Sequence, residues 1–379
     1  MSLIGIFAFV IALLFSVMVH EAGHFLTARK FGMKVTEFFL GFGKRLWSFR
    51  RGETEFGLKA IPAGGYCRIE GMTPEDEMPE GEESRAFFKA SSLRKLIVLG
   101  AGSFAHFCLG TILIFIIFFG VGVSSILPIV SSIEPQTPAE AAGFHVGDRI
   151  VKIGDVTIND WANQSSLIRD SKGKELIFTV SRNGEKVIIK AAPEYLAKEK
   201  RYRLGFFATI GNQRYGAVAA VSHTASAVRA LTVESTKSLI ALPTKVPALL
   251  RETFQGEKRD PNGLVGVVGA ARVSGQTLQS QSLSGHERTA TFLLLIASLN
   301  IFVGLFNLLP ILPLDGGHMA VAIVDEIRAF IARLRGRPRP QGIDVNVLTP
   351  VTMVVFVLLA VLTVLLVIAD IFNPISLNL

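Results

Sequence analysis

Residues 19–27 read Val-His-Glu-Ala-Gly-His-Phe-Leu-Thr and end an uncharged, apolar run that begins at residue 3. His20 and His24 are four residues apart, so both lie on one face of a helix, with Glu21 beside them. Two imidazoles at this spacing can hold one zinc ion, which leaves the carboxylate free to take a proton from a metal-bound water. The motif therefore predicts a catalytic zinc site with His20 and His24 as ligands and Glu21 as the general base.

The position of this motif separates it from a chance match. By background residue frequencies, a chain of this length shows the pattern His-Glu-x-x-His by coincidence roughly once in a hundred. Residues 3–19 are suited to lipid, and two histidines and a glutamate at the end of such a helix are costly unless they serve a function. A metal site is therefore favoured over coincidence.

The composition indicates an integral membrane protein. Half of the 379 residues are hydrophobic and the mean hydropathy is +0.45, which is too apolar for an ordinary soluble protein of this size. Four apolar runs, at residues 3–19, 96–119, 289–309 and 351–369, approach or meet the ~20 residues needed to cross a bilayer. The first run lacks a basic leader and a small-residue cleavage site, so we interpret it as a retained span rather than a signal peptide.

Charge and cysteine content exclude other classes of protein. The net charge of +8 is spread over the loops, which fits contact with the lipid bilayer and predicts no nucleic-acid partner. Cys67 and Cys108 fall in a polar loop and in a span, so no disulfide framework is expected. Basic residues follow the first span and lie between the third and fourth, which predicts that both loops are cytoplasmic. We therefore expect a multi-pass protein of the cytoplasmic membrane, with residues 121–288 outside the cytoplasm and the active site toward it.

The loop after the first span has strand signals rather than helical ones. Residues 46–49 and 54–61 have the pattern of short strands, and Arg51-Gly52-Glu53 supplies a hairpin turn. The aromatic content is high for a solvated loop, so we expect a membrane-associated hairpin that offers an unpaired edge to an extended peptide near His24. A plain surface hairpin is the alternative.

The segment between the second and third spans carries the signals of an inserted domain. Residues 129–193 alternate strands and turns, with a hairpin around Asn183-Gly184. The sequence Pro-Ala-Glu-Ala-Ala-Gly at residues 138–143, followed by Gly-Asp-Arg-Ile at 147–150, resembles a bacterial PDZ domain, a module that takes a peptide or protein C-terminus as an added strand. Residues 203–206 are expected to supply its closing strand. A small Ig-like β unit is the alternative.

Two further stretches follow this domain. Residues 216–250 have helical patterning with one buried face, and we expect them on the outer surface of the membrane. Residues 263–275 are rich in glycine and valine, which predicts a partly embedded loop near the active-site cavity.

A second motif supplies a third metal ligand. It reads Asn-Leu-Leu-Pro-Ile-Leu-Pro-Leu-Asp-Gly-Gly at residues 307–317, directly after the third span. The prolines and the glycine pair break the helix, which is tolerated in a membrane only where protein or water meets the backbone. Asp315 is therefore a charge at the membrane edge, on the same side as His20 and His24, and completes a zinc site with an open fourth position. Alternatively, Asp315 only caps the following helix.

Together these motifs resemble the site-2 protease family of intramembrane zinc metalloproteases. The resemblance rests on His20-Glu21-x-x-His24, the PDZ-like insert, and Asn307-x-x-Pro followed by Leu-Asp315-Gly, and it extends over nearly the whole chain. It implies an intramembrane zinc endopeptidase that cuts single-span membrane proteins near the cytoplasmic leaflet, after a first protease has removed their outer domain. Pre-cut anti-sigma factors and remnant signal peptides are the implied bacterial substrates.

The resemblance also assigns roles by position. His20, His24 and Asp315 would ligate zinc, Glu21 would be the base, and Asn307 would help to hold the substrate backbone. Asn300 and His106 are further candidates for substrate binding, but both depart from the family pattern. The second span has Gly-Ser-x-x-His-Phe where the family has Gly-Pro-x-x-Asn-Phe, and Asn300 stands seven residues before Asn307 rather than five. For His106, the alternative is a hydrogen bond that packs it against another helix.

The expected fold is a polytopic α-helical membrane protein with four transmembrane helices, a membrane-associated β-hairpin region and an inserted extracytoplasmic α/β PDZ domain. The expected segments are the first span with the zinc motif (1–28), a cytoplasmic loop with the hairpin (29–92), the second span (93–123), the PDZ domain (124–210), an amphipathic helix and Gly-rich loop (211–288), the third span with Leu-Asp-Gly (289–318), a cytoplasmic basic segment (319–346) and the fourth span (347–372). Two rival functions stay open: a non-catalytic membrane PDZ scaffold, and another membrane zincin that acts on soluble or lipidated peptides.

Overall fold

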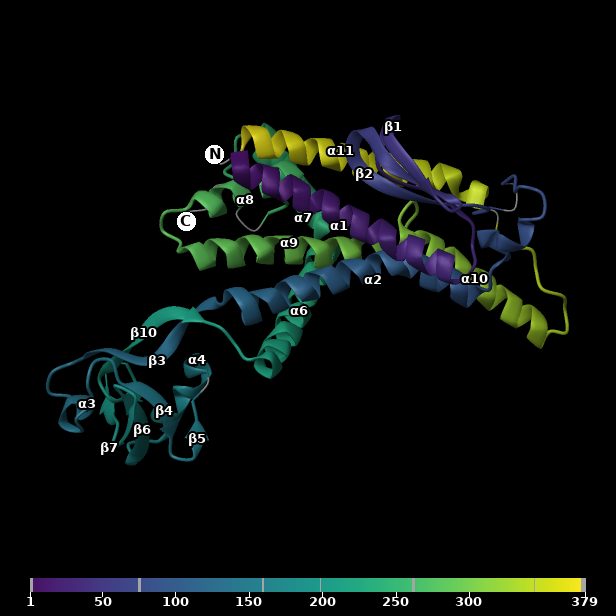
Figure 1. Cartoon of the computed structure of the whole chain (residues 1–379). Helices are drawn as coiled ribbons and strands as arrows, with labels where there is room; N and C mark the ends of the chain where they lie inside the picture. The colour runs from purple at the N-terminus through teal and green to yellow at the C-terminus, as the bar shows by residue number, and fades with distance from the viewer. Residues whose placement is uncertain are drawn as a thin grey trace. The chain divides into compact units, whose positions relative to one another are not determined.

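The computed structural model describes residues 3–73, 76–158, 160–197, 199–260, 263–343 and 345–375, without the side chains of residues 162–163 and 345–346. The chain divides into two compact units (Figure 1). The membrane unit comprises Met1–Ile117 and Val218–Leu379, and the inserted unit comprises Phe118–Ala217. The inserted unit thus interrupts the membrane unit in the sequence after its second apolar helix.

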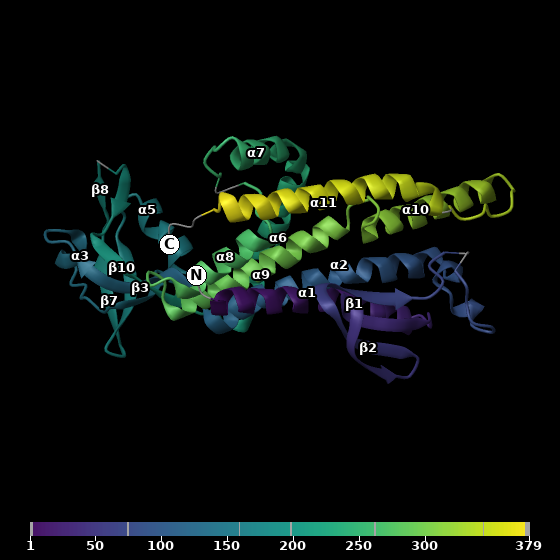
Figure 2. The ribbon, with the colours of Figure 1, turned by 90° about the horizontal axis from the view of Figure 1, so that it is seen from above.

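Each of the four predicted apolar runs forms one helix of the membrane unit. They are α1 (Leu3–Lys30), α2 (Ser92–Ile116, continued by a π-helical turn to Val121), α9 (Gly285–Asn307) and α11 (Thr349–Phe372). Within the described residues these four helices, of 23 to 30 residues each, are long and apolar enough to cross a membrane. Helices α1, α2 and α9 lie side by side in both views of the ribbon (Figure 1, Figure 2).

Small residues bring these three helices into backbone contact. A Cβ added at Gly23 of α1 would lie 2.4 Å from the carbonyl oxygen of Ala101 in α2. A Cβ added at Gly110 of α2 would lie 3.1 Å from the carbonyl oxygen of Ala297 in α9. Helices in lipid associate through such close packing, because the surrounding acyl chains are as apolar as the helices themselves. The crossing of α1, α2 and α9 therefore depends on glycine at these positions.

The loop after α1 folds into a hairpin with its turn at Gly52, as predicted. Its strands are β1 (Val35–Arg51) and β2 (Thr54–Ile69), and both are longer than expected. Residues 37–40 of β1 pair with two separate parts of β2. Phe38 of β1 pairs with both Phe56 and Cys67 of β2. Residues 65–69 of β2 therefore pair along one side only and form a strand edge. Membrane association of the hairpin stays a prediction.

The stretch expected to be a Gly-rich loop, at residues 263–275, is instead mostly helical, so that prediction is wrong. The remaining helices of the membrane unit are η1 (Glu83–Arg85), η2 (Phe87–Lys89), α6 (Ala217–Ile240), α7 (Leu242–Phe254), α8 (Val267–Gln279), α10 (Asp315–Leu334) and η4 (Val345–Leu348). Gly266 and Gly269 donate their backbone N–H groups to the Asp370 carboxylate of α11, at 3.0 and 2.8 Å, and an added Cβ on either glycine would collide with that carboxylate. These glycines serve close approach rather than loop flexibility.

The inserted unit is built on one antiparallel sheet with strand order β10-β3-β4-β6-β7, to which β5 is added beside β4. Its strands are β3 (Val123–Ile133), β4 (Arg149–Ile153), β5 (Val156–Thr157), β6 (Leu176–Arg182), β7 (Glu185–Ala191) and β10 (Phe206–Gln213). A separate pair is formed by β8 (Glu194–Leu196) and β9 (Arg201–Arg203). Three short helices complete the unit: α3 (Pro138–Ala141), α4 (Trp161–Gln164) and α5 (Ser166–Asp170).

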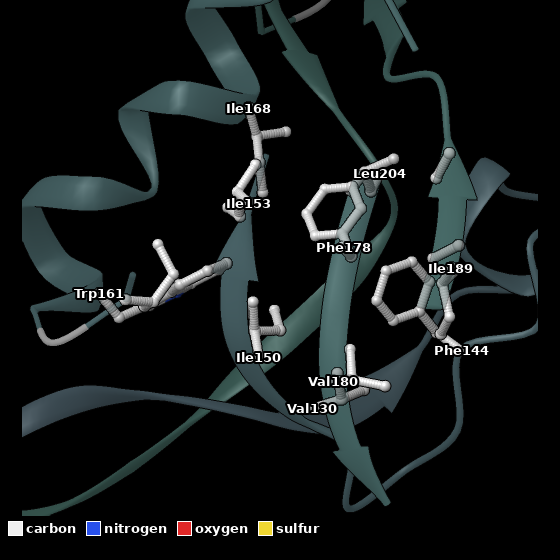
Figure 3. Close-up of a cluster of buried hydrophobic side chains, with 13 residues drawn as sticks. Val130, Phe144, Ile150, Ile153, Trp161, Ile168, Phe178, Val180, Ile189 and Leu204 are labelled. Carbon is white, nitrogen blue, oxygen red and sulfur yellow. The ribbon is translucent and has the colours of Figure 1, made fainter. Parts of the chain in front are cut away.

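A cluster of buried hydrophobic side chains holds the inserted unit together (Figure 3). Phe178 and Val180 are two residues apart on β6 and both lie in the cluster, because alternate strand residues face the same side of a sheet. The ring of Phe144 packs edge-to-face on Phe178 with the centroids 5.3 Å apart. Burial of the hydrophobic side chains of this cluster drives the folding of the unit.

The inserted unit has the predicted hairpin, but the strand predicted at residues 203–206 starts later. The hairpin around Asn183 and Gly184 joins β6 and β7, and both residues have the positive φ of a tight hairpin turn. The strand expected at residues 203–206 begins later, since β9 ends at Arg203 and β10 starts at Phe206. Between them Leu204 is buried in the core and Gly205 has φ of +88°. The PDZ assignment itself stays a prediction.

Asp148 is a buried charge of the inserted unit, and both of its carboxylate oxygens accept hydrogen bonds. Its carboxylate accepts bonds from Arg182 Nε at 2.7 Å, from Arg182 Nη2 at 2.8 Å and from the His145 backbone N–H at 2.8 Å. Burial raises the pKa of Asp148, but the hydrogen bonds from Arg182 and His145 outweigh it and hold the pKa below its usual value. The pair therefore stabilises the unit above pH ~4, and this stabilisation is lost as the pH falls through the lowered pKa.

Substitution Asp148→Asn is expected to destabilise the inserted unit by about 2 kcal/mol at neutral pH, because it removes charged hydrogen-bond partners of Arg182. The chain has two tryptophans, so Trp47→Phe leaves Trp161, buried in this core, as a specific fluorescent reporter in the full-length protein. The difference in unfolding midpoint between this reporter protein and its Asp148→Asn variant should shrink as the pH drops below ~4. A difference that does not depend on pH would show that the charge of Asp148 is not what stabilises the unit.

Candidate metal centre

Three side chains of the ligand type meet at one point of the membrane unit. His20 and His24 of α1 and Asp315 at the start of α10 each offer one ligand atom, and these atoms lie within 4.8 Å of one another. The Nε2 atoms of the two histidines are 3.1 Å apart, and Asp315 Oδ2 lies 3.3 Å from His20 Nε2 and 3.4 Å from His24 Nε2. Both histidines are buried, at 9% and 8% exposure. The structure thus brings together the three residues that the two motifs singled out.

The backbone of α2 sets the orientation of His24. Its Nδ1 lies 2.7 Å from the carbonyl oxygen of Val98, which can only accept a hydrogen bond, so Nδ1 carries the proton. The lone pair of neutral His24 is therefore on Nε2, which faces His20 and Asp315. A hydrogen bond of this kind to the second ring nitrogen is the usual way in which proteins orient a metal-binding histidine.

Glycine in α2 makes room for both imidazole rings. A Cβ added at Gly102 would lie 2.4 Å from His24 Nε2 and 2.5 Å from His20 Cε1. Any other residue at this position would therefore push the two rings away from their present places. The sequence singled out Gly102 only as part of a family pattern, because a contact between helices has no local signal.

Asp315 reaches the site through the break after α9. It is the first residue of α10, and Leu314 occupies the N-cap position without any side-chain capping bond. The alternative that Asp315 only caps this helix is therefore not what the structure has. Two glycines let the start of α10 pack on the preceding loop. A Cβ added at Gly316 would lie 2.3 Å from the Leu308 carbonyl oxygen, and one added at Gly317 would lie 2.5 Å from the Leu312 nitrogen.

The three ligand atoms fit zinc both in their chemical type and in the distances between them. Two ligand atoms bound at ~2.0 Å to a tetrahedral zinc ion lie ~3.3 Å apart. The three distances between the ligand atoms here, 3.1, 3.3 and 3.4 Å, match that spacing. Asp315 Oδ2 is also buried without a hydrogen-bond partner among the described residues, which leaves its lone pair for a cation. The residues present therefore suit a zinc ion with two nitrogen ligands and one oxygen ligand.

Glu21 lies beside this group on the side of the hairpin. An added Cβ at Gly65 of β2 would lie 3.2 Å from Glu21 Cγ. Glu21 is half-buried and is not one of the three converging ligands. Its carboxylate is thus available for proton transfer next to the metal position.

The predicted substrate-binding residues fall in two different environments. His106 and Asn300 are buried, at 3% and 1% exposure, and His106 Nδ1 lies 2.8 Å from Asn300 Oδ1. Asn307, the last residue of α9, is half-exposed and makes no side-chain hydrogen bond within the described part of the chain. Substrate contact by these residues stays a prediction. The hydrogen bond between His106 and α9 is the alternative that the sequence left open.

One feature near the site had not been predicted. His318 is one helical turn beyond Asp315 and lines a cavity of about 750 Å³ between the first turns of α2, helix α10 and residues 339–343. Lys95 of α2 and Asp325 of α10 line the same cavity. The spacing of three residues after Asp315 placed His318 on the same face of a helix, which was the available signal.

Substitution Gly102→Ala is expected to lose bound zinc, because the methyl group would collide with both histidine rings. Gly100→Ala is the matched control in the same helix, since its added Cβ has only ordinary contacts, 3.6 Å from Met319 Cε. Zinc per protein is measured after detergent purification, together with the thermal midpoint of each variant. Full zinc occupancy in the Gly102→Ala protein would contradict the geometry of the site.

Comparison with known proteins agrees with this geometry. The model of peptidase family M50 matches residues 8–359. The chain is 36% identical to zinc metalloprotease Rip1 of Mycobacterium tuberculosis, over 100% of this chain and 99% of that protein. It is 34% identical to zinc metalloprotease Rip1 of Mycolicibacterium smegmatis, over 98% of each, and 27% identical to a putative zinc metalloprotease of Clostridium acetobutylicum, over 99% of this chain and 100% of that protein. The chain therefore belongs to peptidase family M50, the site-2 proteases, and is a zinc-dependent membrane metalloendopeptidase.

Proposed function

We propose that the protein is an intramembrane endopeptidase that cuts the membrane-spanning segments of single-span proteins near their cytoplasmic ends. His20, His24 and Asp315 hold the zinc ion, and Glu21 is the general base. The observation that carries this proposal is the convergence of the three ligand atoms at the spacing of a tetrahedral zinc site, with two of them on an apolar, membrane-length helix. A site in that position acts on peptide bonds at membrane depth.

The chemistry follows from the groups at the site. Zinc supplies a Lewis acid that activates water and polarises the scissile carbonyl. Glu21 takes the proton from the attacking water and then delivers it to the leaving amine. Its side chain lies against Gly65 of the hairpin, next to the metal position. With His20, His24 and Asp315 as its protein ligands, zinc would keep one position for the water from which Glu21 takes the proton.

The substrate must be extended before it is cut, because helical hydrogen bonds bury the scissile carbonyl group. Residues 65–69 of β2 form a strand edge, and Gly65 lies against Glu21. An extended substrate segment that pairs with this edge passes beside the base and the metal. Asn307, half-exposed and without a side-chain hydrogen bond within the described residues, holds the substrate backbone from α9. These features support strand addition as the mode of substrate binding.

The inserted unit selects substrates. As a PDZ-like module outside the cytoplasm, it excludes bulky outer domains or binds the new C-termini left by a first protease. The substrates are then pre-cut anti-sigma factors or remnant signal peptides, in the cytoplasmic membrane. The six-stranded sheet and the Pro-Ala-Glu-Ala-Ala-Gly sequence of residues 138–143 support this role.

The catalytic assignment is tested with Glu21→Gln, His20→Ala and Asp315→Ala in purified protein. Glu21→Gln should retain zinc and lower the cleavage rate of a model single-span substrate by ~10²–10⁴-fold, since only the proton transfer is lost. His20→Ala and Asp315→Ala should lose zinc and cleavage together. Zinc that persists without Asp315 would mean that the third ligand is another residue. A Glu21→Gln protein with full activity would support the scaffold or another catalytic base.

Removal of the inserted unit tests its role in selection. Val123 and Gln213 pair across the ribbon of β3 and β10, so a short Gly-Ser linker can join them in place of residues 124–212. The shortened protein should cleave a substrate with an intact outer domain nearly as fast as its trimmed form, while the full chain prefers the trimmed form. Zinc content serves as the control for an intact membrane unit. If the preference for trimmed substrate is unchanged, the unit does not select substrates.

A further inference from the structure

Three buried polar side chains connect α1, α2 and α9 next to the metal position. Ser16 of α1, His106 of α2 and Asn300 of α9 are 3%, 3% and 1% exposed. Asn300 Nδ2 donates to Ser16 Oγ at 3.0 Å, and Asn300 Oδ1 lies 2.8 Å from His106 Nδ1. Buried polar groups between membrane helices are costly unless they are hydrogen-bonded, and here one amide joins all three helices.

The donors and acceptors in this group have one consistent arrangement. Ser16 Oγ donates to the Ala12 carbonyl oxygen at 2.9 Å and therefore accepts from Asn300 Nδ2. The second amide hydrogen of Asn300 goes to the Ile296 carbonyl oxygen at 2.8 Å. Both donors of the amide are then used, so Asn300 Oδ1 is an acceptor and His106 Nδ1 carries the proton. The orientation of the His106 ring is thereby fixed from α9.

The His106 ring in turn packs on His20. The two ring centroids are 4.9 Å apart and the planes are tilted by 42°. Ser16 is one helical turn before His20 on the same helix, so the contacts form a closed circuit from α1 to α9, to α2 and back to α1. Gly304 of α9 contributes to the close packing, since an added Cβ there would lie 3.2 Å from His106 Cβ.

The two histidines of the zinc motif differ in how their rings are held. His24 Nδ1 is fixed by the Val98 carbonyl oxygen. His20 Nδ1 is buried and has no hydrogen-bond partner among the described residues. Its ring lacks the hydrogen bond that usually orients a metal-binding imidazole, so packing must supply the orientation. The His106 ring is in direct contact with it and is itself held by Asn300.

We propose that His106, Asn300 and Ser16 are positioning residues that orient the His20 ring toward zinc, rather than contacts to the substrate. The proposal rests on the function above, in which His20 is a zinc ligand. Burial to 1–3% keeps these side chains away from a substrate that approaches along the hairpin edge. The proposal also gives the ring at position 106 a role in this chain, because the His106 ring packs directly on the His20 ring.

The test compares Asn300→Leu with Asn307→Leu, the same change at two positions of α9 in the full-length purified protein. Zinc affinity is measured by competition with a chelator, and the visible spectrum of the cobalt-substituted protein reports the geometry of the metal site. Asn300→Leu should weaken zinc binding by ~10–100-fold, the usual effect of losing support for a metal ligand, and should alter the cobalt spectrum. The KM for a single-span substrate should stay near that of the parent protein. Asn307→Leu should raise KM and leave zinc affinity unchanged.

Two further variants keep the test decisive. His106→Asn can still donate to Asn300 but has no ring, and it should weaken zinc binding as Asn300→Leu does. Ser16→Ala is the mildest change and should weaken zinc binding severalfold. It still tests the proposal if a larger substitution prevents folding. Unchanged zinc affinity and cobalt spectrum in these variants, with a raised KM, would overturn the proposal and assign the residues to the substrate. His20→Ala is measured alongside. If this variant retains zinc, the assignment of His20 as a ligand is overturned. If it loses zinc while Asn300→Leu binds zinc normally, only the positioning role is overturned.

Discussion

This structure depends on the close approach of three side chains, those of His20, His24 and Asp315. Their ligand atoms lie 3.1 to 3.4 Å apart, so one cation between them would bind all three groups. The cost of keeping these groups in a membrane helix is thereby offset. Gly23 and Gly102 permit the approach, because they remove the side chains that would separate α1 from α2.

Three other parts of the membrane unit contact the residues of this centre or contribute to it. The backbone of α2 orients His24 through Val98, while the broken segment after α9 delivers Asp315. The hairpin places a strand edge beside Glu21. In the function proposed above, each element supplies one requirement of peptide hydrolysis: a fixed ligand, an added charge, or a base next to an extended chain. Polar residues within the helices, Ser16 and Asn300 among them, connect these parts at the depth of the metal.

Much of this site could be predicted from the sequence, because its signals are local. The spacing of His20 and His24 fixes a shared helix face, and the prolines before Asp315 mark the break in the third apolar helix. The crossings at Gly23 and Gly102 could not be predicted, since they depend on residues distant in sequence. For the same reason the glycines at 266 and 269 were misinterpreted as a loop, although they make room for the Asp370 carboxylate. The double pairing of β1 and the burial of His106 and Asn300 likewise arise only from tertiary packing.

X-ray absorption at the zinc edge of the purified full-length protein tests the His-His-Asp site. We predict one zinc ion per chain, with two imidazole nitrogens and oxygen ligands at ~2.0–2.1 Å and no sulfur. A sulfur ligand at ~2.3 Å would contradict this prediction, because the zinc would then be bound by Cys67 or Cys108 rather than by the His-His-Asp set.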